Sequence, residues 1–140
     1  MTPRFHDWEA KLIGAVEAAK GIPFQWGVHD CCHFSATCVE AMTGTNPLTP
    51  FLGKYNDKKS SLQALKLIGN GSLSKTLEDI FGPAVSPAAA RRGDLSFAVF
   101  DDGPTVGVCL GQYSVFTGEI EGQPGLVTIP TREVSKIFRV

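Results

Sequence analysis

The spacing of apolar residues changes once along this chain, close to residue 93. Before that point apolar residues recur every three or four positions, which is the period of an amphipathic α-helix. After it, short runs of β-branched and aromatic residues are separated by glycine, proline or aspartate, which is typical of short strands. A block of helices followed by a block of strands favours an α+β domain, in which the N-terminal helices pack on one face of a small antiparallel sheet.

Four helices are expected in the first part of the chain. Asp7 is a candidate N-cap for a helix that runs to about residue 20. Asp30 is a candidate N-cap for a second helix, which runs to about residue 43 and stops at Gly44. Two shorter helices are expected at residues 60–68 and 72–81. Serines head both of them, Ser60 or Ser61 in one and Ser72 or Ser74 in the other.

Five short strands are expected in the second part. The β-prone runs cover residues 95–100, 105–110, 113–116, 126–129 and 134–140. A chain of 140 residues has the usual size of one domain. We therefore expect a single domain over residues 1–140, with a helical half at about 1–82, a linker at 83–92 and a sheet half at 93–140.

Charge and hydropathy argue against two classes of partner. The 13 Lys and Arg residues and the 14 Asp and Glu residues give a net charge of −1 without a block of one sign, so we expect no nucleic-acid binding. No run approaches the roughly 20 apolar residues that span a bilayer, so we expect no membrane insertion. The N-terminus carries charged residues where a signal peptide is apolar, and we expect the chain to stay in the cytoplasm where it is made.

The four cysteines are Cys31, Cys32, Cys38 and Cys109. They are too few for a disulfide scaffold in a chain of this length, so free thiols are expected. Neighbouring cysteines make poor joint ligands and the sequence has no Cys-x-x-Cys motif, so we expect no metal site and no cofactor.

Cys31 is the candidate functional residue. If Asp30 caps the second helix, Cys31 lies in its first turn, where free backbone N–H groups and the helix dipole favour a thiolate. Gly27 lets the backbone before Cys31 come close to a bound group, and Trp26 is expected to line a groove. Trp26, Gly27 and Asp30 are therefore the expected binding residues. The alternative is that Cys31 is a small buried residue at the start of a core helix.

Several short motifs occur here in a characteristic order. They are Trp26-Gly27-x-x-Asp30-Cys31, then Arg92-Gly93-Asp94-Leu95 at the start of a strand, then Val106-Gly107-Val108-Cys109-Leu110-Gly111. In this order they resemble the NlpC-type cell-wall cysteine peptidases of the papain-like superfamily. A second set is Phe24-x-Trp26-Gly27, Asp30-Cys31, Ala41-Met42-Thr43-Gly44, Tyr55 and Arg91-Arg92-Gly93-Asp94-Leu95. This set resembles an uncharacterised group of phage and prophage proteins coded among tail genes.

The resemblance implies a papain-like NlpC-type fold with Cys31 as nucleophile. The family's histidine directly precedes the Val-Gly pair, and this chain has Thr105 there, with Thr117 near the place of the third polar residue. Threonine cannot act as a general base near neutral pH. Thr105 is expected to lie nearest Cys31 across the cleft.

Three histidines remain as replacement bases. His29, in the turn before Cys31, is a weak candidate because it could reach the thiol, whereas His33 follows Cys31 by two positions and falls on the wrong face of the helix. His6 needs the first helix to bring it in. A satisfied surface histidine is the alternative for each of them.

The resemblance leaves two functions open. One is a structural or assembly component of a phage tail tip, catalytically degenerate, made in the host bacterial cytoplasm and then part of the virion tail, with other tail proteins as partners. The other is an active peptidase or amidase that cleaves peptidoglycan stem peptides through Cys31. A metal-binding tail protein is a third and weaker alternative. Partner contacts are expected through the loop at residues 46–57 or the C-terminal strand, unless Phe51 and Leu52 fold back onto the helices.

Overall fold

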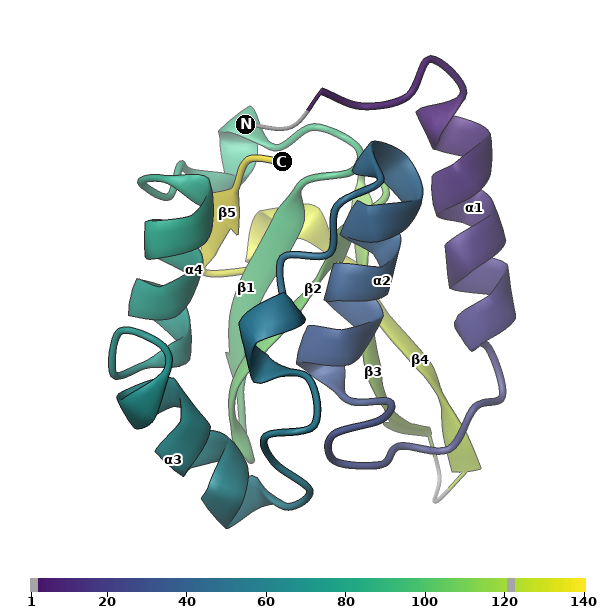
Figure 1. The fold of residues 1–140 in the computed structure, drawn as a ribbon. Helices are drawn as coiled ribbons and strands as arrows, with labels where there is room; N and C mark the ends of the chain where they lie inside the picture. The colour runs from purple at the N-terminus through teal and green to yellow at the C-terminus, as the bar shows by residue number, and fades with distance from the viewer. Residues whose placement is uncertain (1–2, 121–122) are drawn as a thin grey trace.

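A computed structural model describes residues 3–120 and 123–140 and has α+β architecture (Figure 1). The helices are α1 (Trp8–Ala19), α2 (Cys31–Thr43), α3 (Lys58–Leu67) and α4 (Leu73–Phe81), with short 3₁₀ turns η1 (Thr49–Phe51), η2 (Pro87–Ala89) and η3 (Thr131–Glu133). The strands are β1 (Leu95–Phe100), β2 (Gly103–Cys109), β3 (Tyr113–Ile120), β4 (Gln123–Pro130) and β5 (Lys136–Phe138). The expected fold class is confirmed.

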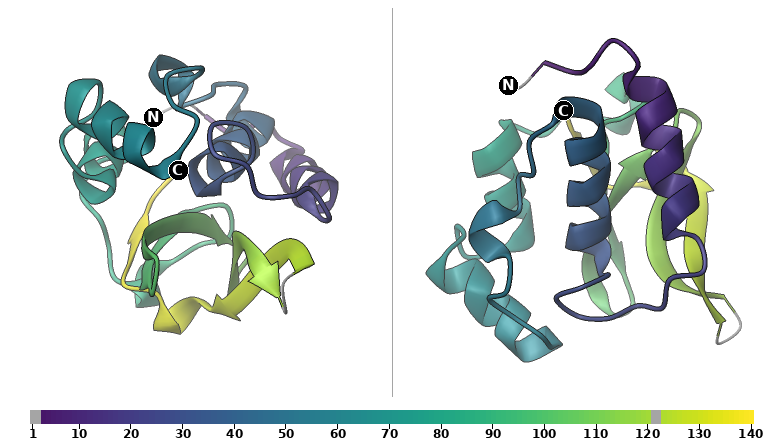
Figure 2. Two further views of the ribbon diagram at one scale, coloured as in Figure 1. Left: turned by 90° about the horizontal axis from the view of Figure 1, so that it is seen from below. Right: turned by 45° about the vertical axis from the view of Figure 1, so that its right-hand side comes forward.

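The strands form one antiparallel sheet in the order β4-β3-β2-β1-β5. The four helices lie together on one side of this curved sheet, as the view from below shows (Figure 2). Leu95 of β1 pairs with Val108 of β2 on one side and with Phe138 of β5 on the other. The first and last strands of the second part are therefore neighbours, although they are far apart in sequence.

The helix boundaries follow local signals with two exceptions. Asp30 caps α2 through its side chain and Gly44 ends the helix at a φ of 82°, as expected. Ser72 likewise caps α4. Asp7 precedes α1 but its side chain makes no capping bond. The third helix begins earlier than expected, because Asp57 and Ser60 form a reciprocal capping box at its start.

The strands other than β1 are longer or shorter than the apolar runs predict. The first one is found as expected at Leu95–Phe100. Pairing extends β3 and β4 to eight residues each, since they form a continuous hairpin ladder. Of the last run, 134–140, only the three residues of β5 are in a strand, and η3 precedes the run.

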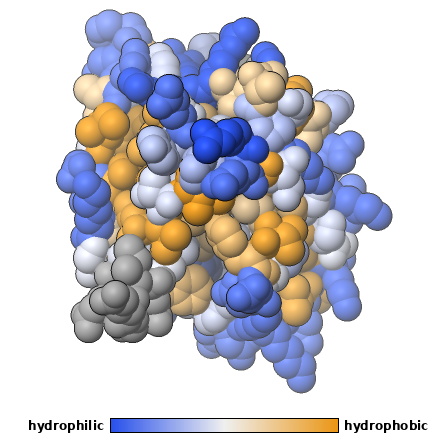
Figure 3. Space-filling model, turned by 180° about the vertical axis from the view of Figure 1, so that it is seen from behind, coloured by the Kyte–Doolittle hydropathy of each residue, from blue (hydrophilic) through white to orange (hydrophobic). Residues whose placement is uncertain are grey.

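The core has one layer on each side of the sheet. The larger layer joins α1, α2 and α4 to the strands and contains the fully buried Leu12, Met42 and Val108. The smaller layer, on the far side, consists of Ala98, Phe116, Val134 and Ile137. Seen from behind, apolar residues appear among polar ones over the sheet side of the molecule (Figure 3). Among the described residues, no helix has the length and hydropathy needed to cross a bilayer.

Two surfaces expected to contact partners are partly covered by the chain itself. Phe51 is only 6% exposed, so it folds back into the protein, which is the alternative to a partner contact. Leu52 of the same loop remains exposed. Strand β5 lies at the edge of the sheet, and Val85 exchanges two backbone hydrogen bonds with Ile137 there. Part of that edge is therefore already occupied.

The sheet opens where α2 begins. Strands β2 and β3 pair only at Val108 with Val115 and at Cys109 with Ser114. The first residues of β2 therefore have backbone groups free on that side, and Ser35 of α2 donates to the carbonyl oxygen of Val106 at 3.3 Å. This opening places the N-terminal turn of α2 directly against β2.

Candidate functional site

Asp30 organises the start of α2. Its side chain is buried, with the residue 1% exposed, and the carboxylate accepts four hydrogen bonds. Oδ1 accepts from the backbone N–H of His33 at 2.8 Å and lies 2.9 Å from its Nδ1. Oδ2 accepts from the backbone N–H of Gly27 at 2.9 Å and from the Tyr55 hydroxyl at 2.8 Å. Both oxygens are thus fully engaged, so Asp30 positions this site and does not serve as a base.

The charge of Asp30 is stabilised by these donors. Burial by itself raises the pKa of the carboxyl, but the hydrogen bonds from His33, Gly27 and Tyr55 outweigh it and hold the pKa below its usual value. For Tyr55, burial and the nearby acidic groups raise the pKa of the phenol well above its usual range. At neutral pH the pair is therefore a carboxylate that accepts from a protonated phenol.

Gly27 brings the preceding loop against the loop that carries Tyr55. Its φ is +81°, and a Cβ added there would lie 2.2 Å from the carbonyl oxygen of Tyr55. A side chain at position 27 is excluded by both the backbone conformation and the space. The neighbouring Trp26 packs edge-on against Phe24 with ring centroids 5.1 Å apart, and Trp26 lines the cavity described below.

Cys31 is the first residue of α2, and its sulfur lies 3.9 Å from that of Cys32. The hydrogen bond from the Cys32 thiol lowers the pKa of Cys31, and the backbone of Val106 also lowers it. Burial raises this pKa but does not outweigh them, so the pKa of Cys31 lies below its usual value. The same hydrogen bond, together with burial, raises the pKa of Cys32 well above the usual range. Burial raises the pKa of Cys38 to about 12. All four cysteines are free, and Cys31 is the thiol favoured to ionise among the first three.

Strand β2 presents Val106 to Cys31. Val106 belongs to the core layer on the helix side, and it lines the same cavity as Cys31. Thr105 pairs with Ala98, a residue of the far-side layer, and its hydroxyl donates to the carbonyl oxygen of Gly103. Since successive residues of a strand point to opposite faces, Thr105 points away from the thiol. Val106, and not the expected Thr105, is therefore the residue of β2 that lies toward Cys31.

Thr117 lies on the helix side of β3, the same face as Val115. Its hydroxyl oxygen is buried and has no hydrogen-bond partner within residues 3–120 and 123–140. No bond joins it to Cys31, Asp30 or His29 in that part of the chain. Its assignment to the third position of a catalytic group remains an expectation from the resemblance.

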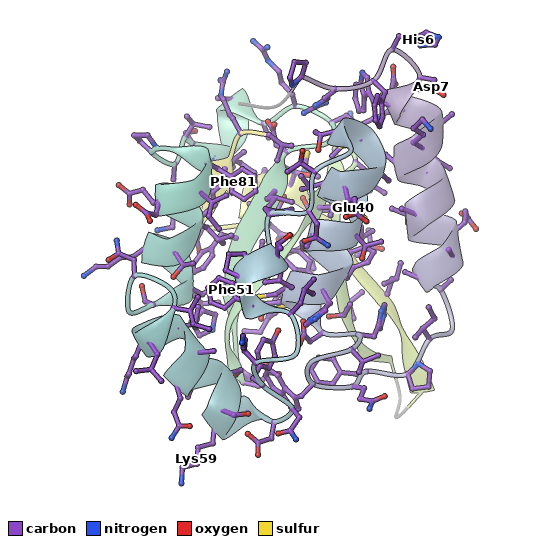
Figure 4. The ribbon with its side chains drawn as sticks, in the orientation of Figure 1. His6, Asp7, Glu40, Phe51, Lys59 and Phe81 are labelled. Atoms are coloured by element: carbon purple, nitrogen blue, oxygen red, sulfur yellow. The ribbon has the colours of Figure 1, made fainter. Side chains whose placement is uncertain are left out.

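The histidines do not meet Cys31 across the cavity. His33 has its Nδ1 held by Asp30 and 3.2 Å from the Tyr55 hydroxyl. His29 is buried, and its ring centroid lies 6.3 Å from that of Phe34. Burial lowers the pKa of His29 more than the charge of Asp30 raises it, so the imidazole is neutral at pH 7. His6 lies at the start of α1 (Figure 4), next to Phe5, which bonds the C-terminal end of α2 at Met42. Cys31 is at the opposite end of that helix.

A cavity of about 260 Å³ lies beside the two thiols. Its titratable lining residues are Asp30, Cys31, Cys32, Tyr55, Lys58 and Asp102. The large apolar side chains that line it are Leu48, Phe51, Leu62, Leu65, Leu73, Leu77, Ile80, Phe81 and Leu95. They come from η1, α3, α4, β1 and the adjoining loop, and Figure 4 shows Phe51 and Phe81 in the region between α4 and α2. No histidine of the described residues is in this lining.

Residues 3–140 match a sequence family described as Domain of unknown function (DUF6950). The chain belongs to this family. No curated protein matches it. Among solved structures, it is similar to the NlpC/p60 domain of the peptidoglycan hydrolase SagA, with a TM-score of 0.58 and 16% identity over 94% of this chain and 97% of that one. At this identity the likeness establishes the fold alone, and the expected NlpC-type fold is confirmed.

Sequence reasoning missed two parts of the site. In the sequence Tyr55 stands out only as one residue of a motif, and its bond to Asp30 joins residues 25 positions apart. The cavity combines η1, α3 and α4 with the start of α2, and nothing in the local sequence predicts how these elements meet. Within the described residues, no group of three or more His, Cys, Asp or Glu side chains is placed to hold a metal ion.

Proposed function

We propose that this chain is a structural or assembly component of a bacteriophage tail tip that keeps the NlpC/p60 fold and does not hydrolyse peptidoglycan. The resemblance of its motifs to a group coded among phage tail genes supports the tail role. Its partners are then other tail proteins, and it acts in the virion tail after synthesis in the host cytoplasm. The similarity of fold to a peptidoglycan hydrolase domain fits descent from a cell-wall enzyme.

The residues around Cys31 support the proposal that the chain does not hydrolyse peptidoglycan. A cysteine peptidase needs a base that takes the thiol proton and then, as an acid, protonates the leaving amine. The cavity beside Cys31 has no histidine among its described lining residues, and β2 presents Val106 there. Asp30, the residue before Cys31, has both oxygens engaged by four donors. Among the described lining residues, no imidazole is available for either step of amide cleavage.

The test has a biochemical arm and a biological arm. Purified protein incubated with peptidoglycan sacculi is expected to release no more soluble fragments than the Cys31→Ala variant. In a phage that encodes the chain, deletion of the gene is expected to reduce infectious particles, and both the wild type and Cys31→Ala are expected to restore them. Sacculus digestion that disappears in Cys31→Ala contradicts the non-hydrolytic part. Normal tails and infectivity after deletion contradict the tail role.

One observation favours peptidoglycan cleavage as a second candidate. The thiol of Cys31 lies at the start of α2 and has a lowered pKa, as an activated nucleophile requires. His29 is neutral and lies in the preceding turn, so a movement of that turn would supply a base. This candidate predicts sacculus digestion that is lost in both Cys31→Ala and His29→Ala, while His6→Ala retains it.

A further inference from the structure

We propose that the cavity beside Cys31 holds an apolar acyl chain and that Cys31 accepts this acyl group from an acyl thioester. The proposal concerns an acyl acceptor site and does not require hydrolysis or a tail role. It joins three features of the same place: a thiol at the start of α2, an apolar cavity next to it and the absence of histidine from the described lining.

The size and lining of the cavity fit an apolar group. Its volume of about 260 Å³ exceeds the roughly 150 Å³ of engineered apolar cavities that bind benzene. Phe51, Leu65 and Leu77 are among nine large apolar side chains in the wall. Ionised or sugar-like groups would lose their hydration against these apolar side chains, whereas a hydrocarbon chain gains by leaving water. A charged stem peptide is therefore a poor occupant of this cavity.

The chemistry needs no base or acid from the protein. The Cys31 thiol first loses its proton to water, and the thiolate attacks the carbonyl carbon of the donor to form a new carbon–sulfur bond. The bond between that carbon and the donor sulfur then breaks, and the electron pair leaves with the donor as a thiolate. One thioester is exchanged for another, and nothing is oxidised or reduced. An amide, in contrast, releases an amine that must be protonated as it leaves.

The same surroundings make the acylated form persistent. Water attacks a thioester efficiently when a base removes its proton. His33 is held by Asp30 and Tyr55, and Asp30 is itself fully engaged by its donors. The acyl chain packed in the cavity also keeps water from one side of the new bond. We therefore expect a stable S-acyl-Cys31 form.

The experiment compares two coenzyme A thioesters that differ only in chain length. Folded protein is incubated with octanoyl-CoA or acetyl-CoA, and adducts are followed by intact mass and assigned to a cysteine by peptide mapping. Each methylene buried in an apolar site contributes about a fourfold gain in binding. We expect Cys31 to be acylated at least tenfold faster by the octanoyl donor, and the adduct to survive desalting and to be removed by hydroxylamine. Cys31→Ser is expected to abolish it, and Cys109→Ser, at a free thiol that does not line the cavity, is expected to retain it.

A matched pair of variants tests the cavity itself. Leu62 lines the cavity and is 51% exposed, so Leu62→Glu places a charge in the wall with little loss of core packing. Leu67, on the same helix, is 85% exposed and is not in the lining, so Leu67→Glu is the control. We expect Leu62→Glu to remove most of the octanoyl preference and Leu67→Glu to keep it. Alkylation of Cys31 by iodoacetamide should be similar in both variants, which shows that the thiol itself is unchanged.

The opposing outcomes are distinct. Equal rates with the two donors, or equal effects of the two variants, would overturn the assignment of the cavity to the acyl chain. Alkylation of Cys31 without any octanoyl adduct, or no alkylation of the folded protein at all, would overturn Cys31 as acceptor. Rapid release of octanoate would identify a thioester hydrolase and overturn a stable acceptor. None of these outcomes depends on the sacculus assay, so the two proposals fail independently.

Discussion

Replacement of Asp30 measures how much the start of α2 depends on one buried carboxylate. Asp30→Ala removes an N-cap, which costs about 1 kcal/mol, and leaves the Gly27 N–H and the Tyr55 hydroxyl without their acceptor, at about 1–3 kcal/mol each if they stay buried. We expect a loss of about 3–7 kcal/mol in the free energy of unfolding. That is a large part of the 5–15 kcal/mol that typically stabilises a domain.

Asp30→Asn is the more informative change because it preserves the shape. The amide oxygen still accepts from the backbone of His33, but the NH₂ group faces a donor, the N–H of Gly27. We expect a loss of about 2 kcal/mol and, for a chain of this size, a fall of about 4–8 °C in melting temperature. Urea unfolding followed by tryptophan fluorescence, with circular dichroism as a second probe, measures the difference.

Asp57→Asn is the matched control. Asp57 also caps a helix and accepts from the backbone of its third residue, but it is exposed to solvent. Water can replace what the substitution removes there, so its effect on unfolding should be clearly smaller than that of Asp30→Asn. Equal effects would show that capping alone, and not the buried network around Asp30, accounts for the loss.

The pH dependence gives a second measure of the same carboxylate. The folded-state pKa of Asp30 lies below its usual value of 3.8, so the stabilisation is complete above that pH and is lost as pH falls through the lower folded-state pKa. The gap in unfolding free energy between wild type and Asp30→Asn should therefore be constant near pH 5–7 and narrow below about pH 4. A gap that stays constant down to pH 2 refutes the assignment of the loss to the charge.

Three further predictions address other parts of the site and the sheet. Cys32→Ala removes the thiol that donates to Cys31, so the pKa of Cys31 should rise and the midpoint of its alkylation by iodoacetamide should move to higher pH; an unchanged midpoint contradicts this. In Tyr113→Phe, Tyr55 is the one remaining tyrosine, and its raised pKa predicts no phenolate absorbance above pH 10 until the chain unfolds; an earlier rise contradicts its burial. Gly107→Ala places a Cβ 2.3 Å from the carbonyl oxygen of Val115, so we expect a loss of at least about 2 kcal/mol in urea unfolding, and a neutral effect contradicts the close approach of β2 and β3.

The sequence by itself determined the elements that depend on local chemistry. Asp30 and Gly44 delimit α2 because a capping carboxylate and a residue at positive φ act within one turn of the helix. The start and end of β1 follow in the same way from its apolar run. The order of the motifs also predicted the NlpC-type fold, and the structural similarity to the SagA domain confirms it. Cys31 at the first position of α2 is a direct consequence of the Asp30 cap.

Tertiary structure alone decided what surrounds Cys31. The strand pattern does not reveal which face of β2 meets α2, because a shift of one residue exchanges Thr105 for Val106 and only packing sets the register. The bond from Tyr55 to Asp30 depends on a loop whose path is fixed by the close contact at Gly27. The cavity exists because η1, the helices α2, α3 and α4, and the strands β1 and β2 leave space between their side chains. That space is a property of their packing, which no local pattern encodes.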